Sequence, residues 1–195
     1  MSVFDNIRNV VTGLFPHGKK RKFVQYRHTG KCKVPCNSCG DYYFRIFEKG
    51  TEIKVPRHEN CDCYYKDVQE MLAGTVSKKG KEGPDYYLKY FGRLPSYYIT
   101  KKEAIEKYDW KRGKNTLSGK APGKMIGGDD YDNKDKIFPI KEGRKWFECD
   151  VDYVSGPRDS ARLVYSNDGL IFFSPDHYTG DIYYIIGENE EGDDE

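Results

Sequence analysis

Apolar and acidic residues alternate along residues 146–153, and this is the most regular pattern in the chain. A period of two residues predicts a β-strand with one apolar face and one acidic face. The apolar positions are Phe147, Cys149, Val151 and Tyr153, and the acidic positions are Glu148, Asp150 and Asp152.

Two further apolar runs, 161–166 and 170–174, are joined by Asn167-Asp168-Gly169. Asn, Asp and Gly tolerate the left-handed backbone of a tight turn, so these runs are predicted to form a β-hairpin. Residues 181–186 are predicted to form the last strand.

Helical patterns come before these strands. Residues 85–91 are rich in apolar side chains and are followed by Gly92. Thr100 and Glu103 form a capping-box pattern, which opens a helix that we expect to run to about Lys107. Helices followed by consecutive strands predict an α+β fold, with N-terminal helices packed on an antiparallel sheet.

The N-terminal part is less regular. Residues 3–15 have helical spacing and precede the basic run 19–22, which indicates either a short docking helix with a solvated linker or a membrane-surface or nucleic-acid anchor. Residues 42–47 favour a strand and residues 65–73 a helix.

The Lys- and Gly-rich segment 77–84 is predicted to be a linker that buries nothing. We therefore divide the chain into a Cys/His-rich N-terminal module (1–76), this linker, a C-terminal domain (85–187) and an acidic tail (188–195).

The net charge of +2 conceals an uneven distribution. Residues 1–83 carry +7, residues 84–187 carry +1 and residues 188–195 carry −6. The small total therefore does not exclude a polyanionic partner. The tail is expected to be a disordered solubilising end, or else a mimic of RNA that folds back over basic residues.

The sequence contains no apolar run long enough for a transmembrane helix. Asp5 and Arg8 interrupt the first apolar stretch, so we expect no conventional signal peptide. The expectation is cytoplasmic synthesis with delivery or extracellular action.

Cysteine and histidine cluster in the N-terminal module as Cys36-x-x-Cys39 and His58-x-x-Cys61-x-Cys63. Thiolates and imidazole at such spacings can bind zinc tetrahedrally, and a short segment with few aliphatic residues needs a staple of this kind. Disulfides or free thiols are the alternatives, and the choice of the fourth ligand among His58, Cys61 and Cys63 stays open.

The acidic strand has basic residues nearby in sequence, because Arg158 and Arg162 lie just before and at the start of the next strand. The hairpin beyond returns to His177. A carboxylate, an imidazole and guanidinium groups on one sheet face suit phosphodiester cleavage, with an acid, a base and cations that stabilise phosphoryl charge. An ordinary surface network of ion pairs would also fit this spacing.

The segment from Leu88 to Ile186 resembles the small microbial guanyl-preferring ribonucleases of the barnase type. The residues that carry the resemblance include Leu94-Pro95, Tyr98-Ile99-Thr100-Lys101, Ala121-Pro122-Gly123-Lys124, Ile126-Gly127-Gly128-Asp129, Gly143-Arg144, Trp146, Glu148, Asp150, Ser155-Gly156, Arg158, Arg162, Tyr165-Ser166, Asp168 and Asp176-His177-Tyr178.

The resemblance implies a metal-independent endoribonuclease that cuts single-stranded RNA through a 2′,3′-cyclic phosphate. It implies Glu148 as general base, His177 as general acid, and Lys101, Arg158 and Arg162 as phosphate-binding residues. It also implies Asp150 as an internal ion-pair partner of the arginines, and substrate contacts from Tyr178, Tyr131, Asn133, Lys134 and Asp135.

Lys134 and Asp135 stand where relatives carry Arg and Glu, and Gly169 replaces an aromatic residue. These departures predict a weakened or altered preference for guanine.

The resemblance further implies an acidic, barstar-like inhibitor and a role as a bacterial or phage-associated toxin. Residues 36–63 have a shorter resemblance to phage minor head (head morphogenesis) proteins, which implies phage head or delivery components as partners. The alternatives to an enzyme are a non-catalytic nucleic-acid-binding protein and a structural protein of the phage head.

Overall fold

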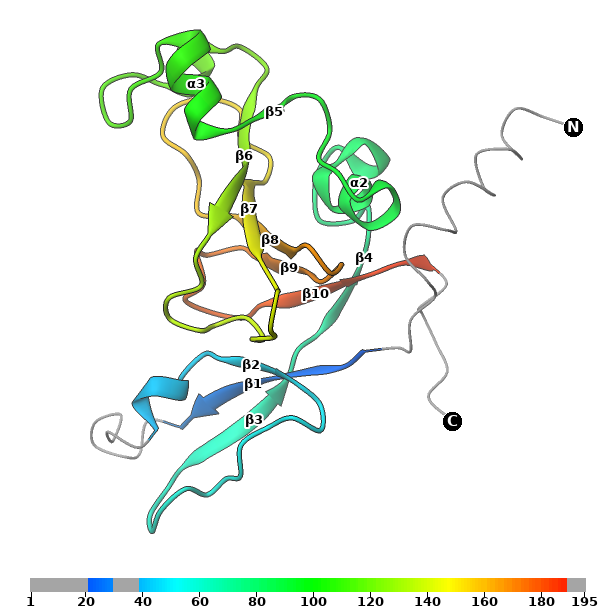
Figure 1. Cartoon of the computed structure of the whole chain (residues 1–195), viewed down its shortest axis with the longest axis vertical. Helices are drawn as coiled ribbons and strands as arrows, with labels where there is room; N and C mark the ends of the chain where they lie inside the picture. Colours follow the sequence, from blue (N-terminus) through cyan, green and yellow to red (C-terminus); the bar gives the residue numbers. More distant parts are fainter. Residues whose placement is uncertain (1–20, 30–38, 189–195) are drawn as a thin grey trace, which may run out of the picture.

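A computed structural model describes residues 21–29 and 39–188 (Figure 1). Residues 1–20, 30–38 and 189–195 lie outside the described residues, and with them the expected helix 3–15, Cys36 and nearly all of the acidic tail. In the part of the chain that the structure describes, no helix has the length and apolar character required to cross a membrane.

The larger of two sheets has seven strands in the order β4-β10-β9-β8-β7-β6-β5. The β4–β10 and β5–β6 pairs are parallel, and the other pairs are antiparallel. Its strands are β4 (Glu70–Leu72), β5 (Tyr98–Ile99), β6 (Met125–Tyr131), β7 (Trp146–Asp150), β8 (Arg162–Ser166), β9 (Ile171–Ser174) and β10 (Tyr183–Ile186).

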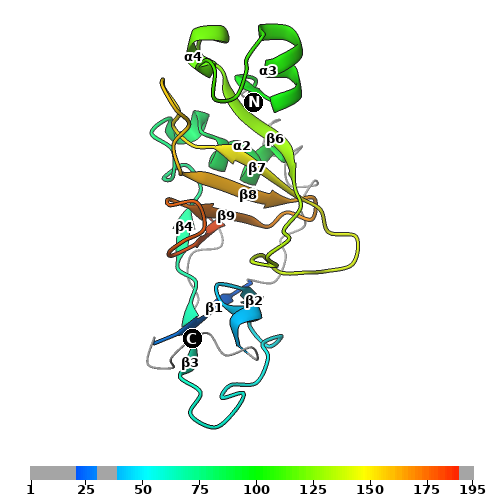
Figure 2. The same ribbon diagram turned by 90° about the vertical axis from the view of Figure 1, so that its left-hand side faces the viewer.

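The smaller sheet is antiparallel, in the order β2-β1-β3. It consists of β1 (Phe23–His28), β2 (Ile46–Glu48) and β3 (Cys63–Asp67), with the 3-10 turn η1 (Gly40–Tyr42) between the first two. Figure 2 shows this sheet at the end of the molecule opposite α3 (Lys101–Tyr108) and α4 (Leu117–Lys120).

Local sequence signals explain the helices. α2 (Pro84–Phe91) has Pro84 at its first position and ends at Gly92, which adopts the left-handed conformation with φ of 64°. α3 begins with the predicted capping box, in which the Thr100 hydroxyl accepts from the Glu103 amide and the Glu103 carboxylate accepts from the Thr100 amide. The mixture of helices and mainly antiparallel strands is the α+β class predicted from the sequence.

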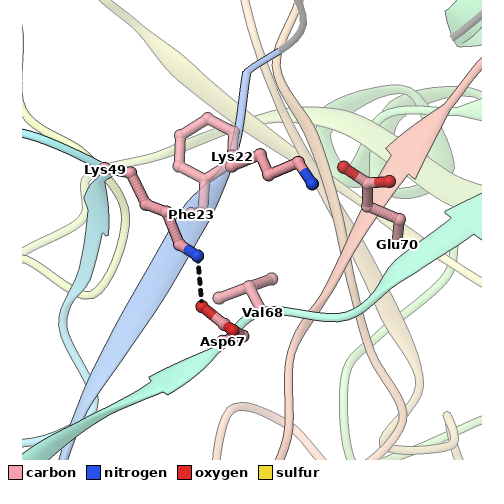
Figure 3. Close-up of a pocket in the computed structure, with 6 residues that line it drawn as sticks. All are labelled: Lys22, Phe23, Lys49, Asp67, Val68 and Glu70. Carbon is pink, nitrogen blue, oxygen red and sulfur yellow. Dashed lines mark ion pairs between the residues drawn. The ribbon is translucent and has the colours of Figure 1, made fainter. Parts of the chain in front are cut away.

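The two sheets share one apolar cluster. Phe23 and Ile46 of the smaller sheet are buried with Trp146 and Phe172 of the larger one, and with Phe138 from the connection between β6 and β7. The edge of this contact also has a shallow pocket, where Lys49 and Asp67 form an exposed ion pair at 2.6 Å beside Phe23 (Figure 3).

Two local predictions are wrong. Residues 65–73 form β3 and β4 rather than a helix, because β4 pairs in parallel with β10. Residues 77–84, predicted to bury nothing, are structured and partly buried. They include the 3-10 turn η2 (Gly80–Glu82), and the buried Ser77 hydroxyl donates to Asp152 at 2.8 Å. The proposed domain division itself stays a prediction.

Candidate active site

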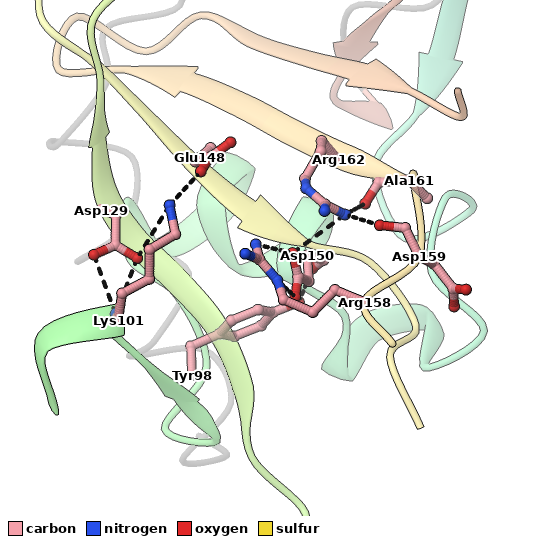
Figure 4. Close-up of polar contacts among 9 residues, drawn as sticks. All are labelled: Tyr98, Lys101, Asp129, Glu148, Asp150, Arg158, Asp159, Ala161 and Arg162. Atoms are coloured by element: carbon pink, nitrogen blue, oxygen red, sulfur yellow. Dashed lines mark hydrogen bonds and ion pairs between the residues drawn. The ribbon is translucent and has the colours of Figure 1, made fainter. Parts of the chain in front are cut away.

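Asp150 lies at the end of β7 and is the centre of a buried ion-pair cluster (Figure 4). Its partner in register on β8 is Arg162, whose Nη1 lies 3.2 Å from Asp150 Oδ1. Arg158 donates to both carboxylate oxygens, at 2.7 and 2.6 Å. The expectation that Arg158 and Arg162, which are close in sequence to the acidic strand, lie beside its carboxylates is thus confirmed.

The electrostatics of this cluster favour charged arginines. Burial alone would lower the pKa of Arg158, but its hydrogen bonds to Asp150 outweigh burial and raise it. Bidentate pairing also fixes the guanidinium plane, so Arg158 is held in one orientation.

Glu148 is two residues before Asp150 on β7, and it points to the same sheet face (Figure 4). Lys101, the first residue of α3, donates from Nζ to Glu148 Oε1 at 2.7 Å. Burial acts to raise the pKa of Glu148, but the Lys101 hydrogen bond and the charges of Lys101, Arg158 and Arg162 lower it overall. The carboxylate is therefore ionised at neutral pH and can accept a proton.

Asp129 also lies in this site, beside Lys101 and Glu148, although no role was predicted for it from the sequence. It is the register partner of Glu148 on β6, and both of its oxygens accept from the Lys101 backbone amide at 3.1 Å. The β6–β7 register shifts between Gly127 and Asp129, and a side chain at Gly127 would come within 2.5 Å of Cys149 Cβ. The Gly127-Gly128-Asp129 run in the sequence is the signal that could have indicated this irregularity.

His177 and Tyr178 occupy the turn after β9, and both have positive φ, of 58° and 70°. The Tyr178 amide donates to Ser174 Oγ at 2.8 Å, which holds this turn. His177 is exposed, whereas the Tyr178 ring is buried and lies 5.5 Å from the Tyr131 ring.

The Tyr178 hydroxyl is buried and has no hydrogen-bond partner among the described residues. Burial raises the pKa of Tyr178, and the nearby charge of Glu148 raises it further. The hydroxyl thus stays a neutral donor in the neighbourhood of Glu148.

The predicted base-recognition loop follows β6. Asn133 closes this loop, because its amide group donates to the Phe138 carbonyl at 2.9 Å and accepts from the Phe138 amide at 3.1 Å. Lys134 and Asp135 are exposed, and Lys134 pairs with Asp132 at 3.2 Å. The Asn133 side chain is thus committed to the loop itself, whereas Lys134 and Asp135 are free of that role.

The predicted metal ligands lie far from this site in the fold, at the smaller sheet. Cys39, His58 and Cys61 are brought together there, and Cys63 begins β3. Cys149, on the apolar face of the alternating strand, is buried in the core of the larger sheet.

Comparison with known proteins shows which family the C-terminal half of the chain is similar to. A family model described as ribonuclease matches residues 76–181. The chain is 48% identical over 94 residues to a ribonuclease of Heyndrickxia coagulans, an alignment that covers 48% of this chain and 84% of that protein.

Ribonucleases of Bacillus intermedius and Bacillus pumilus match at the same identity and over the same length. The alignment covers 57% of each of these two proteins. The family model spans more than half of the chain and includes Lys101, Glu148, Arg158, Arg162 and His177. The chain therefore belongs to the ribonuclease family of the barnase type and is an endoribonuclease, as its sequence resemblance predicted.

Proposed function

We propose that this endoribonuclease cleaves single-stranded RNA by transesterification to a 2′,3′-cyclic phosphate, which water then opens. The observation that carries the proposal is the ionised Glu148 carboxylate, held by Lys101 on the same sheet face as Arg158 and Arg162. One negatively charged base among three cations suits a reaction in which a phosphate gains charge.

In the first step Glu148 takes the proton of the ribose 2′-hydroxyl, and the 2′-oxygen attacks phosphorus. The bond from phosphorus to the 5′-oxygen breaks as His177 gives a proton to that oxygen. In the second step the roles reverse: His177 takes a proton from water, whose oxygen attacks phosphorus. The bond from phosphorus to the 2′-oxygen breaks as Glu148 returns its proton to that oxygen.

The cations act on the phosphate throughout. Arg158 and Arg162 are already oriented by Asp150, so stabilising the developing charge requires little rearrangement. Lys101 pairs with Glu148 in the free enzyme, and transfer of the Lys101 ammonium to the substrate phosphate would leave Glu148 a stronger base.

The central test is substitution of the proposed base and acid. Glu148→Gln and His177→Ala are each expected to lower kcat by about 10²- to 10⁴-fold, the usual contribution of general acid–base catalysis. Glu142→Gln, at an exposed position, is the matched control and should keep wild-type kcat. Wild-type kcat in either site variant would remove that residue from its role.

Two substrate experiments test the reaction itself. A 2′-deoxy nucleotide at the scissile position should abolish cleavage, because it removes the nucleophile. Added Mg²⁺ should not change the initial rate, since no step in this mechanism needs a metal ion.

The proposed base preference is for purines, with guanine less strongly favoured than in relatives that carry Glu at the position of Asp135. The Asp135 side chain is one methylene shorter, so its carboxylate reaches less far toward a base edge. Cleavage of dinucleotides that differ only in the 5′ base tests this: Asp135→Glu should sharpen guanine preference. A strict guanine preference in the unchanged protein would contradict the proposal.

We also propose a toxin role, with delivery from the cell in which the protein is made and an acidic inhibitor of the barstar type. Support comes from the cations Lys101, Arg158 and Arg162 that an acidic protein could face at this site, and from the resemblances described above. Co-expression with such an inhibitor should restore growth of cells that the active enzyme kills, while Glu148→Gln should be harmless without it.

A further inference from the structure

The smaller sheet has a cluster of thiols and imidazole that ribonuclease chemistry does not use. Cys39 precedes η1 in the connection between β1 and β2, whereas His58 and Cys61 lie in the connection between β2 and β3. The three ligand atoms all lie within 4.8 Å of one another. Two separate loops therefore meet at this cluster.

The distances match the edges of a metal-coordination tetrahedron. Cys39 Sγ lies 3.4 Å from His58 Nε2 and 3.9 Å from Cys61 Sγ. Zinc bonds of about 2.3 Å to sulfur and about 2.0–2.1 Å to nitrogen give tetrahedral edges of roughly 3.6 Å for S···N and roughly 3.8 Å for S···S. A disulfide would need sulfurs at about 2.05 Å, so the Cys39–Cys61 pair consists of thiols.

The imidazole is oriented as a metal ligand requires. His58 Nδ1 lies 2.7 Å from the Glu59 carbonyl oxygen. A carbonyl can only accept, so Nδ1 carries the proton and Nε2 presents its lone pair toward the Cys39 sulfur. This is the usual outer hydrogen bond of a metal-bound histidine.

A second, independent observation comes from Tyr26 on β1. Tyr26 is fully buried, and its hydroxyl has no hydrogen-bond partner among the described residues. The sulfurs of Cys39 and Cys63 lie near this hydroxyl, so it faces the cluster as a hydrogen-bond donor. A metal-bound thiolate is a better acceptor than a thiol, so a bound cation would give this buried donor its partner.

We propose that Cys39, His58 and Cys61 bind one structural zinc ion that joins the two loops of the smaller sheet. Among the common divalent cations, zinc is the one that typically binds two thiolates and an imidazole. The ion would hold the β1–β2 and β2–β3 connections together in a sheet of only three short strands, where few apolar side chains are available for a core.

Metal analysis of the full-length purified protein gives the first test. We expect about one zinc ion per chain by mass spectrometry, and less than a tenth of that in Cys61→Ser and His58→Ala. Cys149→Ala is the matched cysteine control, and His177→Ala is the matched histidine control; both should keep about one zinc ion. Metal-free protein with an intact smaller sheet would overturn the proposal.

Cobalt substitution keeps the proposal testable even where a ligand variant does not fold. Replacing zinc with Co²⁺ in the unchanged protein should give the visible absorption of tetrahedral cobalt and a thiolate-to-cobalt charge-transfer band. Tyr26→Phe should lower Co²⁺ affinity by about 10- to 100-fold, as loss of an outer-shell partner does. An octahedral spectrum without a thiolate band would exclude the site, whatever the ribonuclease activity.

Discussion

The two sheets accommodate buried polar side chains in opposite ways. In the larger sheet, Asp150 is surrounded by Arg158 and Arg162, so each buried charge has a partner of the other sign. In the smaller sheet, Tyr26 Oη and the Nε atoms of Arg27 and Arg45 are buried without a hydrogen-bond partner among the described residues. Burying a polar group is costly unless it is hydrogen-bonded. The ion-pair cluster around Asp150 is thus complete in itself, whereas these three atoms of the smaller sheet are left without partners in the described part of the chain.

The smaller sheet obtains support from the larger one. Arg27 donates to Asp181 at 2.7 Å, and Lys66 donates to the other oxygen of the same carboxylate at 2.6 Å. The Ile46 amide donates to the Ile137 carbonyl at 2.6 Å. Asp181 follows the His177 turn and Ile137 lies in the loop that Asn133 closes, so the smaller sheet braces both loops of the candidate active site.

The largest effect is expected when the charge at the centre of the Asp150 cluster is removed. Asp150→Ala would leave two buried guanidinium groups without their partner, and we expect a loss of about 3–5 kcal/mol in the free energy of unfolding. Urea denaturation measures this loss. Asp67→Ala, which breaks the exposed ion pair with Lys49, is the control and should cost at most about 1 kcal/mol. Similar losses in the two variants would contradict the distinction drawn between the sheets.

A smaller effect is expected where the sheets meet. Arg27→Ala removes hydrogen bonds to Asp181 and to the Gly180 carbonyl, and bonds that involve a charged group contribute about 1.5–3 kcal/mol each when well buried. Because Asp181 is 40% exposed, we expect a total loss near the lower end of that range.

Hydrogen exchange locates the effect of Arg27→Ala. Backbone amides of residues 179–182 should exchange faster, while those of β7 and β8 should not change. Arg57→Ala is the matched control, since Arg57 is exposed and stacks over the Tyr42 ring. Unchanged exchange at residues 179–182 would show that the smaller sheet does not brace this loop.

Sequence patterns predicted those elements whose causes are local. The Thr100–Glu103 capping box and the alternation that produces β7 both depend on residues close together in the chain. The helix predicted at 65–73 was wrong because β4 is fixed by β10, more than a hundred residues later. The packing of Ser77 likewise depends on Asp152, 75 residues away. The sequence of one segment does not show which distant segment it pairs with.

In the candidate site, too, features with local causes could be predicted and features that depend on distant residues could not. Arg158 and Arg162 could be placed near Asp150 because Arg158 lies in the connection that follows β7 and Arg162 begins β8, the next strand. The place of Asp129 could not be predicted, because it follows from a register shift between β6 and β7. The amide of Asn133 could be named as a contact but not as the group that closes its own loop, since that depends on the backbone conformation reached at Phe138.

The smallest expected effect is a pH dependence of the free energy of unfolding, which we compare at the carboxylates of Asp168 and Asp181. Asp168 in the larger sheet accepts two hydrogen bonds from Arg144, at 2.8 and 2.7 Å. Burial opposes ionisation of Asp168, but Arg144 and Ser166 outweigh it and lower its pKa to about 2. At the sheet contact, the hydrogen bond from Lys66 lowers the pKa of Asp181, and Arg27 adds to this against the effect of burial.

A carboxylate with a lower pKa in the folded protein than in the unfolded chain stabilises the fold above the unfolded value of about 3.9. That stability is lost as the pH falls from about 4 toward 2. For Asp168 we expect the loss to be about 1 kcal/mol once solvent screening is allowed for. Urea denaturation of Asp168→Asn between pH 5 and pH 2.5 should therefore show a flatter decline than the unchanged protein. Asp181→Asn should flatten it less, because the Asp181 side chain is 40% exposed and that of Asp168 is 29% exposed. An equal or larger effect at Asp181 would mean that the contact between the sheets is as tightly paired as the larger sheet itself.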